Sequence, residues 1–158
     1  MLFRSGAFYV HFESKAAAFR ESIIQGVSDV NSAIRQLQNQ HGEAWWPTFV
    51  RFYLGTKRTC DLSESCGLQS LTPEVARSDA TSRAAFETEL MKVAITIAAG
   101  PVSTNAPSDV ESAWIALATL IGAVTLARAV NDPTMADKIA AAAERALLPS
   151  LVIKNKTA

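Results

Sequence analysis

The most informative part of the sequence is Gly6-Ala7-Phe8-Tyr9-Val10-His11-Phe12-Glu13-Ser14-Lys15. It is a short aromatic segment that runs directly into a long amphipathic pattern. From Ser14 onward, large apolar residues recur every three or four positions, which places them on one face of a helix: Phe19, Ile23, Val27, Val30, Ile34 and Leu37. The Ser14 hydroxyl can accept a free backbone N–H of the first turn. The sequence therefore predicts one long helix that Ser14 caps and that ends near Gly42.

The rest of the chain predicts further helices separated by short polar breaks. They are expected at about 44–54, 73–77, 79–99, 108–130 and 133–148. The expected N-caps are Thr72, Asp79 or Ser78, Ser108 (in a capping box with Glu111) and Asp132. No segment shows the period-two alternation of a strand. We therefore predict an all-α fold.

Composition agrees with one helical globular domain. The chain has 158 residues, 49% of them hydrophobic, and a formal net charge of zero. A neutral chain has no global basic field to draw it to DNA, so nucleic-acid binding would depend on a local surface. The start shows no signal peptide, and the most apolar stretch, 113–127, is shorter than the roughly 20 residues that span a bilayer. We expect a cytoplasmic protein with no membrane contact.

Residues for catalysis or metal binding are sparse. Cys60 and Cys66 lie in one polar stretch and are expected to be free thiols; a redox switch or a metal site is the alternative. His11 and His41 lack zinc-site spacing to these cysteines. The sequence contains no P-loop, no Gly-x-Gly-x-x-Gly and no Ser-His-Asp arrangement with supporting glycines. We expect neither an enzyme nor a resident metal or cofactor.

The opening stretch resembles the recognition helix of TetR-family transcriptional regulators at the point where it runs into the next helix. The matching positions are Gly6, Phe8, Tyr9, His11, Phe12, Ser14, Lys15 and Phe19. Segments 65–77 and 122–133 resemble one branch of that family more weakly, because Gly67 stands where the branch has proline. The resemblance implies a TetR-like helical bundle. It would have a partial N-terminal helix-turn-helix over residues 1–20 and a C-terminal ligand-binding and dimerisation domain over 21–158.

A recognition helix enters the major groove with its N-terminal residues facing base edges. The residues that the resemblance places against DNA are Ser5, Gly6, Ala7, Tyr9, His11 and Lys15. The small residues among them would approach the bases, and the polar tips would contact phosphates. For Tyr9 and His11 the alternative is an exposed polar edge.

The family's DNA-binding domain has three helices, with roughly 40 residues before the end of the recognition helix. This sequence lacks the first helix and nearly all of the second, so Phe8 and Phe12 would lose their packing partners. A short helix without packing is marginal in water. We expect this chain, as given, to bind operator DNA poorly. Either an internal Met has been taken as the start, or the chain is a remnant that keeps only sensing and dimerisation.

Aromatic residues cluster after the long helix and suggest a pocket for a small apolar or aromatic effector. The predicted lining is Trp45, Phe49, Phe52, Tyr53, Phe86, Leu90, Met91, Trp114 and Leu117. Ordinary core packing is the alternative. Glu87 and Glu89 are expected to face solvent.

Segment 108–130 is apolar nearly all round, so it should pack on its own core and on something else. With the last helix it could form a four-helix bundle across a two-fold homodimer. Small residues would let the helices approach closely: Ala116, Gly122, Ala123, Ala127 and Ala143. A monomer whose last helix shields this segment is the alternative. The expected function is a ligand-responsive regulator, a repressor, that an effector releases from operator DNA. The alternative is a dimeric small-molecule-binding module with no DNA function.

Overall fold

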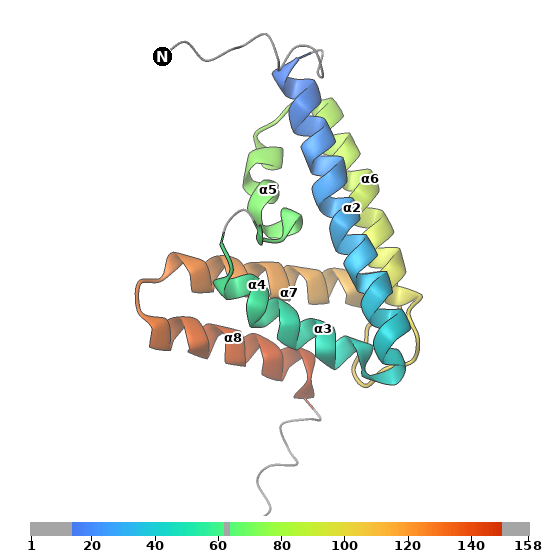
Figure 1. The fold of residues 1–158 in the computed structure, drawn as a ribbon, viewed down its shortest axis with the longest axis vertical. Helices are drawn as coiled ribbons and strands as arrows, with labels where there is room; N and C mark the ends of the chain where they lie inside the picture. Colours follow the sequence, from blue (N-terminus) through green and yellow to red (C-terminus); the bar gives the residue numbers. More distant parts are fainter. Residues whose placement is uncertain (1–13, 62–63, 150–158) are drawn as a thin grey trace, which may run out of the picture.

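The computed structural model describes residues 14–61 and 64–149. All regular structure in these ranges is helical, which confirms the predicted all-α fold. Figure 1 shows an upright pair of helices, α2 and α6, standing on a layer formed by α3, α4, α7 and α8, with α5 between the pair and the layer. The elements are α2 (Lys15–His41), a 3-10 turn (Gly42–Ala44), α3 (Trp45–Leu54), α4 (Thr56–Thr59), α5 (Gly67–Ala76), α6 (Ala80–Ala98), α7 (Val110–Ala129) and α8 (Pro133–Leu147).

Helix α2 begins and ends as its sequence predicts. The Ser14 hydroxyl accepts the Ala17 N–H at 3.1 Å, and Gly42 ends the helix with a positive φ of 47°. On the predicted apolar face, Ile23, Val27 and Ile34 are completely buried. This face packs against α6, so the longest helix of the chain has a rigid support over its length.

Helix α5 differs from its prediction. We expected a helix capped by Thr72 and starting at Pro73, yet α5 starts at Gly67 and contains Pro73 in its interior. The Thr72 hydroxyl instead donates to the Leu68 carbonyl. Leu68 and Val75 are buried on one face, and this packing holds the segment helical despite the missing proline N–H.

The start of α7 is shifted by one residue from its prediction. Asp109, not Ser108, is the N-cap, and Ser112, not Glu111, completes the capping box. The Asp109 carboxylate accepts the Ser112 N–H at 2.7 Å. Asp is as strong an N-cap as Ser, and both candidates have a capping-box partner three residues later, so the local sequence does not distinguish them.

Helix α7 is long and apolar enough to cross a membrane by length and composition, and it is the one such helix among the described residues. Core helices share this property. Four of the five small residues expected to let helices approach closely are buried within this chain: Ala116, Ala123, Ala127 and Ala143. They lie where α7 and α8 pack on each other and on neighbouring helices. The fifth, Gly122, leaves open space beside its Cα.

The N-cap carboxylates of α6 and α7 make stability depend on pH. Hydrogen bonds from the Ser82 and Ser112 backbone N–H groups lower the pKa of Asp79 and Asp109 below the usual value. Since the folded pKa is the lower one, the stabilisation is complete above the unfolded value of about 4 and is lost as pH falls through the folded pKa.

We expect the thermal midpoint of the wild type to fall more steeply below about pH 4 than that of the D79N/D109N double variant. Asparagine keeps the cap and does not titrate. Thermal unfolding between pH 2 and 7 measures this, with E87Q as an exposed mid-helix control. Equal slopes for the wild type and the double variant would contradict the assignment.

Candidate ligand pocket

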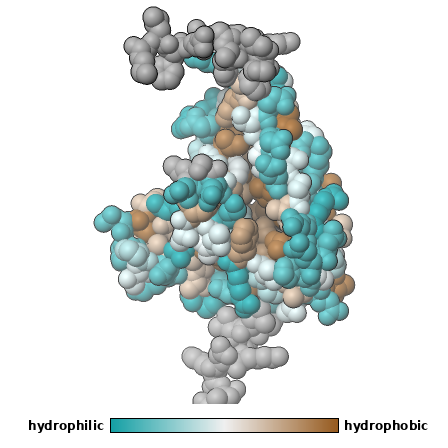
Figure 2. Space-filling model, in the orientation of Figure 1, coloured by the Kyte–Doolittle hydropathy of each residue, from teal (hydrophilic) through white to brown (hydrophobic). Residues whose placement is uncertain are grey.

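A pocket of about 380 Å³ lies between α2, α3, α4 and the start of α5. In Figure 1 these elements meet in the middle of the molecule, and Figure 2 shows apolar side chains among hydrophilic ones on that face. The lining residues are Gly26, Asp29, Val30, Ala33, Phe49, Phe52, Tyr53, Lys57, Glu64, Ser65, Cys66 and Gly67.

Helix α3 supplies an aromatic wall. Phe49 and Tyr53 are one helical turn apart, and their ring centroids lie 5.8 Å from each other in a tilted arrangement. Phe52, which is 38% exposed, completes the wall. Aromatic faces of this kind give a planar apolar molecule a large contact area.

Tyr53 adds a polar group to the wall. Its side chain is 3% exposed, and its hydroxyl has no hydrogen-bond partner among the described residues. Burial raises the pKa of the phenol, and the nearby Cys66 thiol adds to the effect, so Tyr53 is a neutral donor at physiological pH. A buried donor without a partner costs about 1–3 kcal/mol.

Charged groups lie at the edge of the pocket. The Lys57 ammonium donates to the Glu64 carbonyl at 2.6 Å and lies 5.8 Å from the centroid of the Phe52 ring. Asp29 accepts a hydrogen bond from the Gln25 amide at 2.7 Å, and both Asp29 and Glu64 are exposed. The charged edge is therefore open to solvent, whereas Phe49 and Tyr53 of the aromatic wall are buried.

The start of α5 forms the side of the pocket that faces α2. Cys66 provides no side-chain cap for α5, and Gly67 lies directly against α2. A Cβ atom on Gly67 would stand 2.7 Å from the carbonyl carbon and oxygen of Gly26. The two backbones touch here, so α5 cannot move towards α2 without displacing it.

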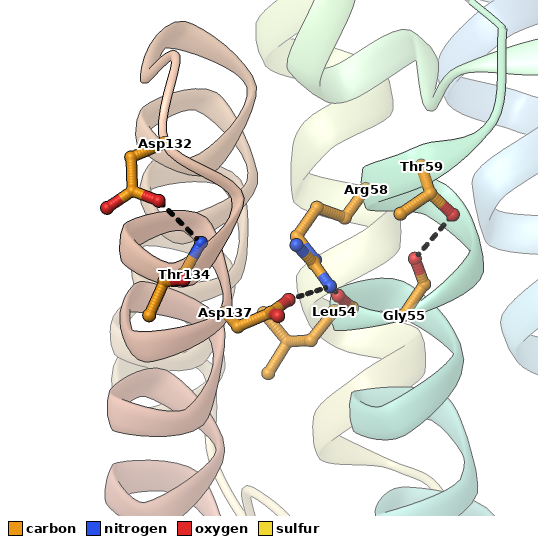
Figure 3. A network of polar contacts seen from close by, with 7 residues as sticks. All are labelled: Leu54, Gly55, Arg58, Thr59, Asp132, Thr134 and Asp137. Carbon is orange, nitrogen blue, oxygen red and sulfur yellow. Dashed lines mark hydrogen bonds and ion pairs between the residues drawn. The ribbon is translucent and has the colours of Figure 1, made fainter.

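Helix α4 connects the pocket to α7 and α8. Arg128 of α7 donates to the carbonyls of Lys57 and Cys60, both at 2.8 Å. Figure 3 shows Arg58 of α4 reaching α8, where it donates to Asp137 at 2.9 Å. The Lys57 edge of the pocket is thus tied to the two last helices.

We expect Arg128→Met to lower the free energy of unfolding by about 1–3 kcal/mol, because two carbonyls lose a charged donor. Urea denaturation measures this loss. Arg145→Met removes an exposed arginine from the last turn of α8 and is expected to change stability by less than about 0.5 kcal/mol. Equal stability of the two variants would show that the Arg128 contacts contribute little.

The structure places the predicted pocket residues in two groups. Phe49, Phe52 and Tyr53 line the pocket. The others lie away from it: Trp45 and Leu117 are buried in the core, Phe86, Leu90 and Trp114 are partly buried against the core, and Met91 is 42% exposed. Glu89 does not face solvent as expected, since it is 9% exposed and paired with Lys92 at 2.6 Å, whereas Glu87 is exposed.

Several lining residues were not anticipated. Gly26, Asp29 and Ala33 lie within α2, and Lys57 and Gly67 lie between the expected helices 44–54 and 73–77, where the sequence predicted no helix. One signal was available in the sequence, because an isolated glycine inside a helical pattern often marks a close approach. The partner of that approach, Gly67, carries no such signal.

Five of the residues that the resemblance placed against DNA lie outside the described residues: Ser5, Gly6, Ala7, Tyr9 and His11. The sixth, Lys15, is exposed at the first position of α2. No acidic residue occupies that first turn. A cation at the positive end of a helix dipole suits a phosphate.

Cys60 and Cys66 are free thiols, and the described residues hold no group of three metal-ligating side chains. No protein-family model matches the chain, and no curated protein is significantly similar to it.

Proposed function

We propose that this protein is a ligand-responsive transcriptional regulator of the TetR type. Helix α2 is the observation that carries the proposal. It begins directly after the motif that resembles a recognition helix, and its middle supplies Gly26, Asp29, Val30 and Ala33 to the pocket wall. One continuous helix therefore joins the DNA-facing segment to the ligand site.

The contact between Gly26 and Gly67 provides a way for a bound ligand to move α2. A ligand that presses on the start of α5 acts on α2 through touching backbones. The shift at the far end of α2 would change the spacing of two recognition segments in a dimer, and the half-sites on DNA would no longer fit. The ligand must bind the two states unequally for this to work.

A homodimer through α7 and α8 completes the proposal. Ile115 and Leu126 of α7 and Met135 of α8 are 63%, 59% and 50% exposed, and Gly122 leaves open space. Between Glu111 and Arg128 the helix has no charged residue. The uncharged α7 part of this face can meet an identical surface without repulsion, so a second copy of the chain fits it.

We expect Leu126→Glu to weaken dimerisation by more than about tenfold, since it buries a charge at each symmetric contact. Sedimentation velocity over a dilution series measures this effect. Val102→Glu places the same charge on an 89% exposed loop residue and should leave the dimer intact. A wild-type monomer at every concentration would overturn the dimer.

DNA binding is tested on the native product isolated from its own cells, whose N-terminus is fixed by intact-mass measurement. The test is a gel shift against the DNA that flanks its gene, at physiological salt. We expect specific retardation by the native product. If it retards this DNA no better than random DNA, the regulator is excluded and the dimeric ligand-binding module takes its place.

A further inference from the structure

We propose that the pocket binds a small aromatic carboxylate, with the ring against α3 and the carboxylate at the start of α5. This inference rests on the proposed function, because it names the chemical class of the effector. It depends on the side chains that line the pocket and not on the coupling through α2.

The aromatic wall sets the size and shape of the ligand. Phe49, Phe52 and Tyr53 lie along one side of a pocket of about 380 Å³, with Val30 of α2 among the residues opposite. Pockets near the lower end of the usual range of roughly 300–1,000 Å³ hold molecules of one or two rings. A flat ring stacked or tilted against these side chains would bury most of its area.

Three groups that can donate hydrogen bonds border the same space. The Tyr53 hydroxyl is buried close to the Cys66 thiol and meets the geometry of a hydrogen bond with none of the described residues. The Lys57 ammonium uses one of its donors on the Glu64 carbonyl and retains the others. The first turn of α5 begins at the pocket without a side-chain cap. The Gln69 N–H donates to the Cys66 carbonyl, and the Gly67 N–H at the pocket and the positive helix end remain available. A carboxylate accepts from all three kinds of donor at once.

The two acidic residues at the pocket edge do not cancel this preference. Asp29 and Glu64 are exposed, where water and salt screen their charge. The Tyr53 side chain is buried, and a hydrogen bond to an ionised acceptor is stronger there than in water. A hydrogen-bond acceptor is therefore favoured beside the buried Tyr53, and a cation only beside the exposed Asp29 and Glu64.

Isothermal titration with three molecules of one shape tests the inference: benzoate, the neutral benzamide and the cationic benzamidine. We expect benzoate to bind about tenfold more tightly than benzamide, as one charge-assisted hydrogen bond would give, and benzamidine not to bind. Lys57→Met should weaken benzoate about tenfold and leave benzamide unchanged. Lys138→Met, an exposed lysine of α8, is the matched control.

Tyr53→Phe should weaken the binding of both benzoate and benzamide. Its thermal midpoint should be no lower than that of the wild type, because the lost hydroxyl has no hydrogen-bond partner among the described residues. Benzamidine binding as tightly as benzoate, no binding by any of the three, or an unchanged benzoate affinity in Lys57→Met would each overturn the ligand class.

These experiments distinguish a failure of the proposed ligand class from a failure of the proposed regulator function. If benzoate does not bind but the native product still binds its flanking DNA, the ligand class is wrong and the regulator stands. If benzoate binds with the expected variant pattern and the native product does not bind its flanking DNA, the ligand site is supported and the regulator function is excluded.

Discussion

Replacing Gly67 by alanine is expected to lower the free energy of unfolding by about 1–3 kcal/mol, although alanine is the better helix former. The new Cβ would stand 2.7 Å from the backbone carbonyl of Gly26. A backbone cannot move aside as a flexible side chain can, so α5 must separate from α2. Urea denaturation followed by circular dichroism measures the loss.

Gly26→Ala is the matched control, because it makes the same chemical change on the other side of the contact. Its Cβ would meet the Leu71 Cδ1 atom at 3.2 Å, a side-chain end that can rotate away. The gain in helix propensity, up to about 1 kcal/mol, offsets the crowding. We expect Gly26→Ala to be near neutral. Equal losses in the two variants would contradict the steric account.

Truncating Trp45 to alanine is expected to have the largest effect on stability, about 3–5 kcal/mol. The side chain is completely buried, its ring meets Trp46 edge-on at 5.5 Å, and its indole N–H donates to the Pro101 carbonyl at 2.9 Å. The variant therefore loses core volume and the tie between α3 and the loop that follows α6. Thermal unfolding with a denaturant series provides the measurement.

Phe52→Ala, on the same helix, is the comparison for Trp45→Ala. Phe52 is 38% exposed and lines the pocket, so its loss should cost about 1 kcal/mol. A Trp45 variant as stable as the Phe52 variant would mean that the core does not depend on this tryptophan.

Local signals predicted the helices well. The period of the apolar residues and the Ser14 cap located α2, and the Asp79 and Asp132 caps located the starts of α6 and α8. These features depend on residues within one turn of each other, so the sequence contains all the information they need.

Contacts between distant segments explain what the sequence did not predict. The start of α5 depends on Gly67 fitting against Gly26 and on burial of Leu68, which outweigh the break that Pro73 suggested. The pocket has the same origin, because α4 and α5 bring Lys57 and Cys66 beside the aromatic wall. Six of the nine expected lining residues lie away from the pocket, and the spacing of residues within one helix does not reveal this.

We propose that α2 couples the pocket to DNA binding. Fluorescence anisotropy tests this coupling: labelled flanking DNA is bound to the native product and titrated with a molecule that calorimetry has shown to fill the pocket. Because coupling is reciprocal, saturating DNA must weaken ligand binding by the factor by which ligand weakens DNA binding. We predict release of the DNA as the pocket fills. A ligand that saturates the pocket while the DNA stays bound with unchanged affinity would contradict the claim.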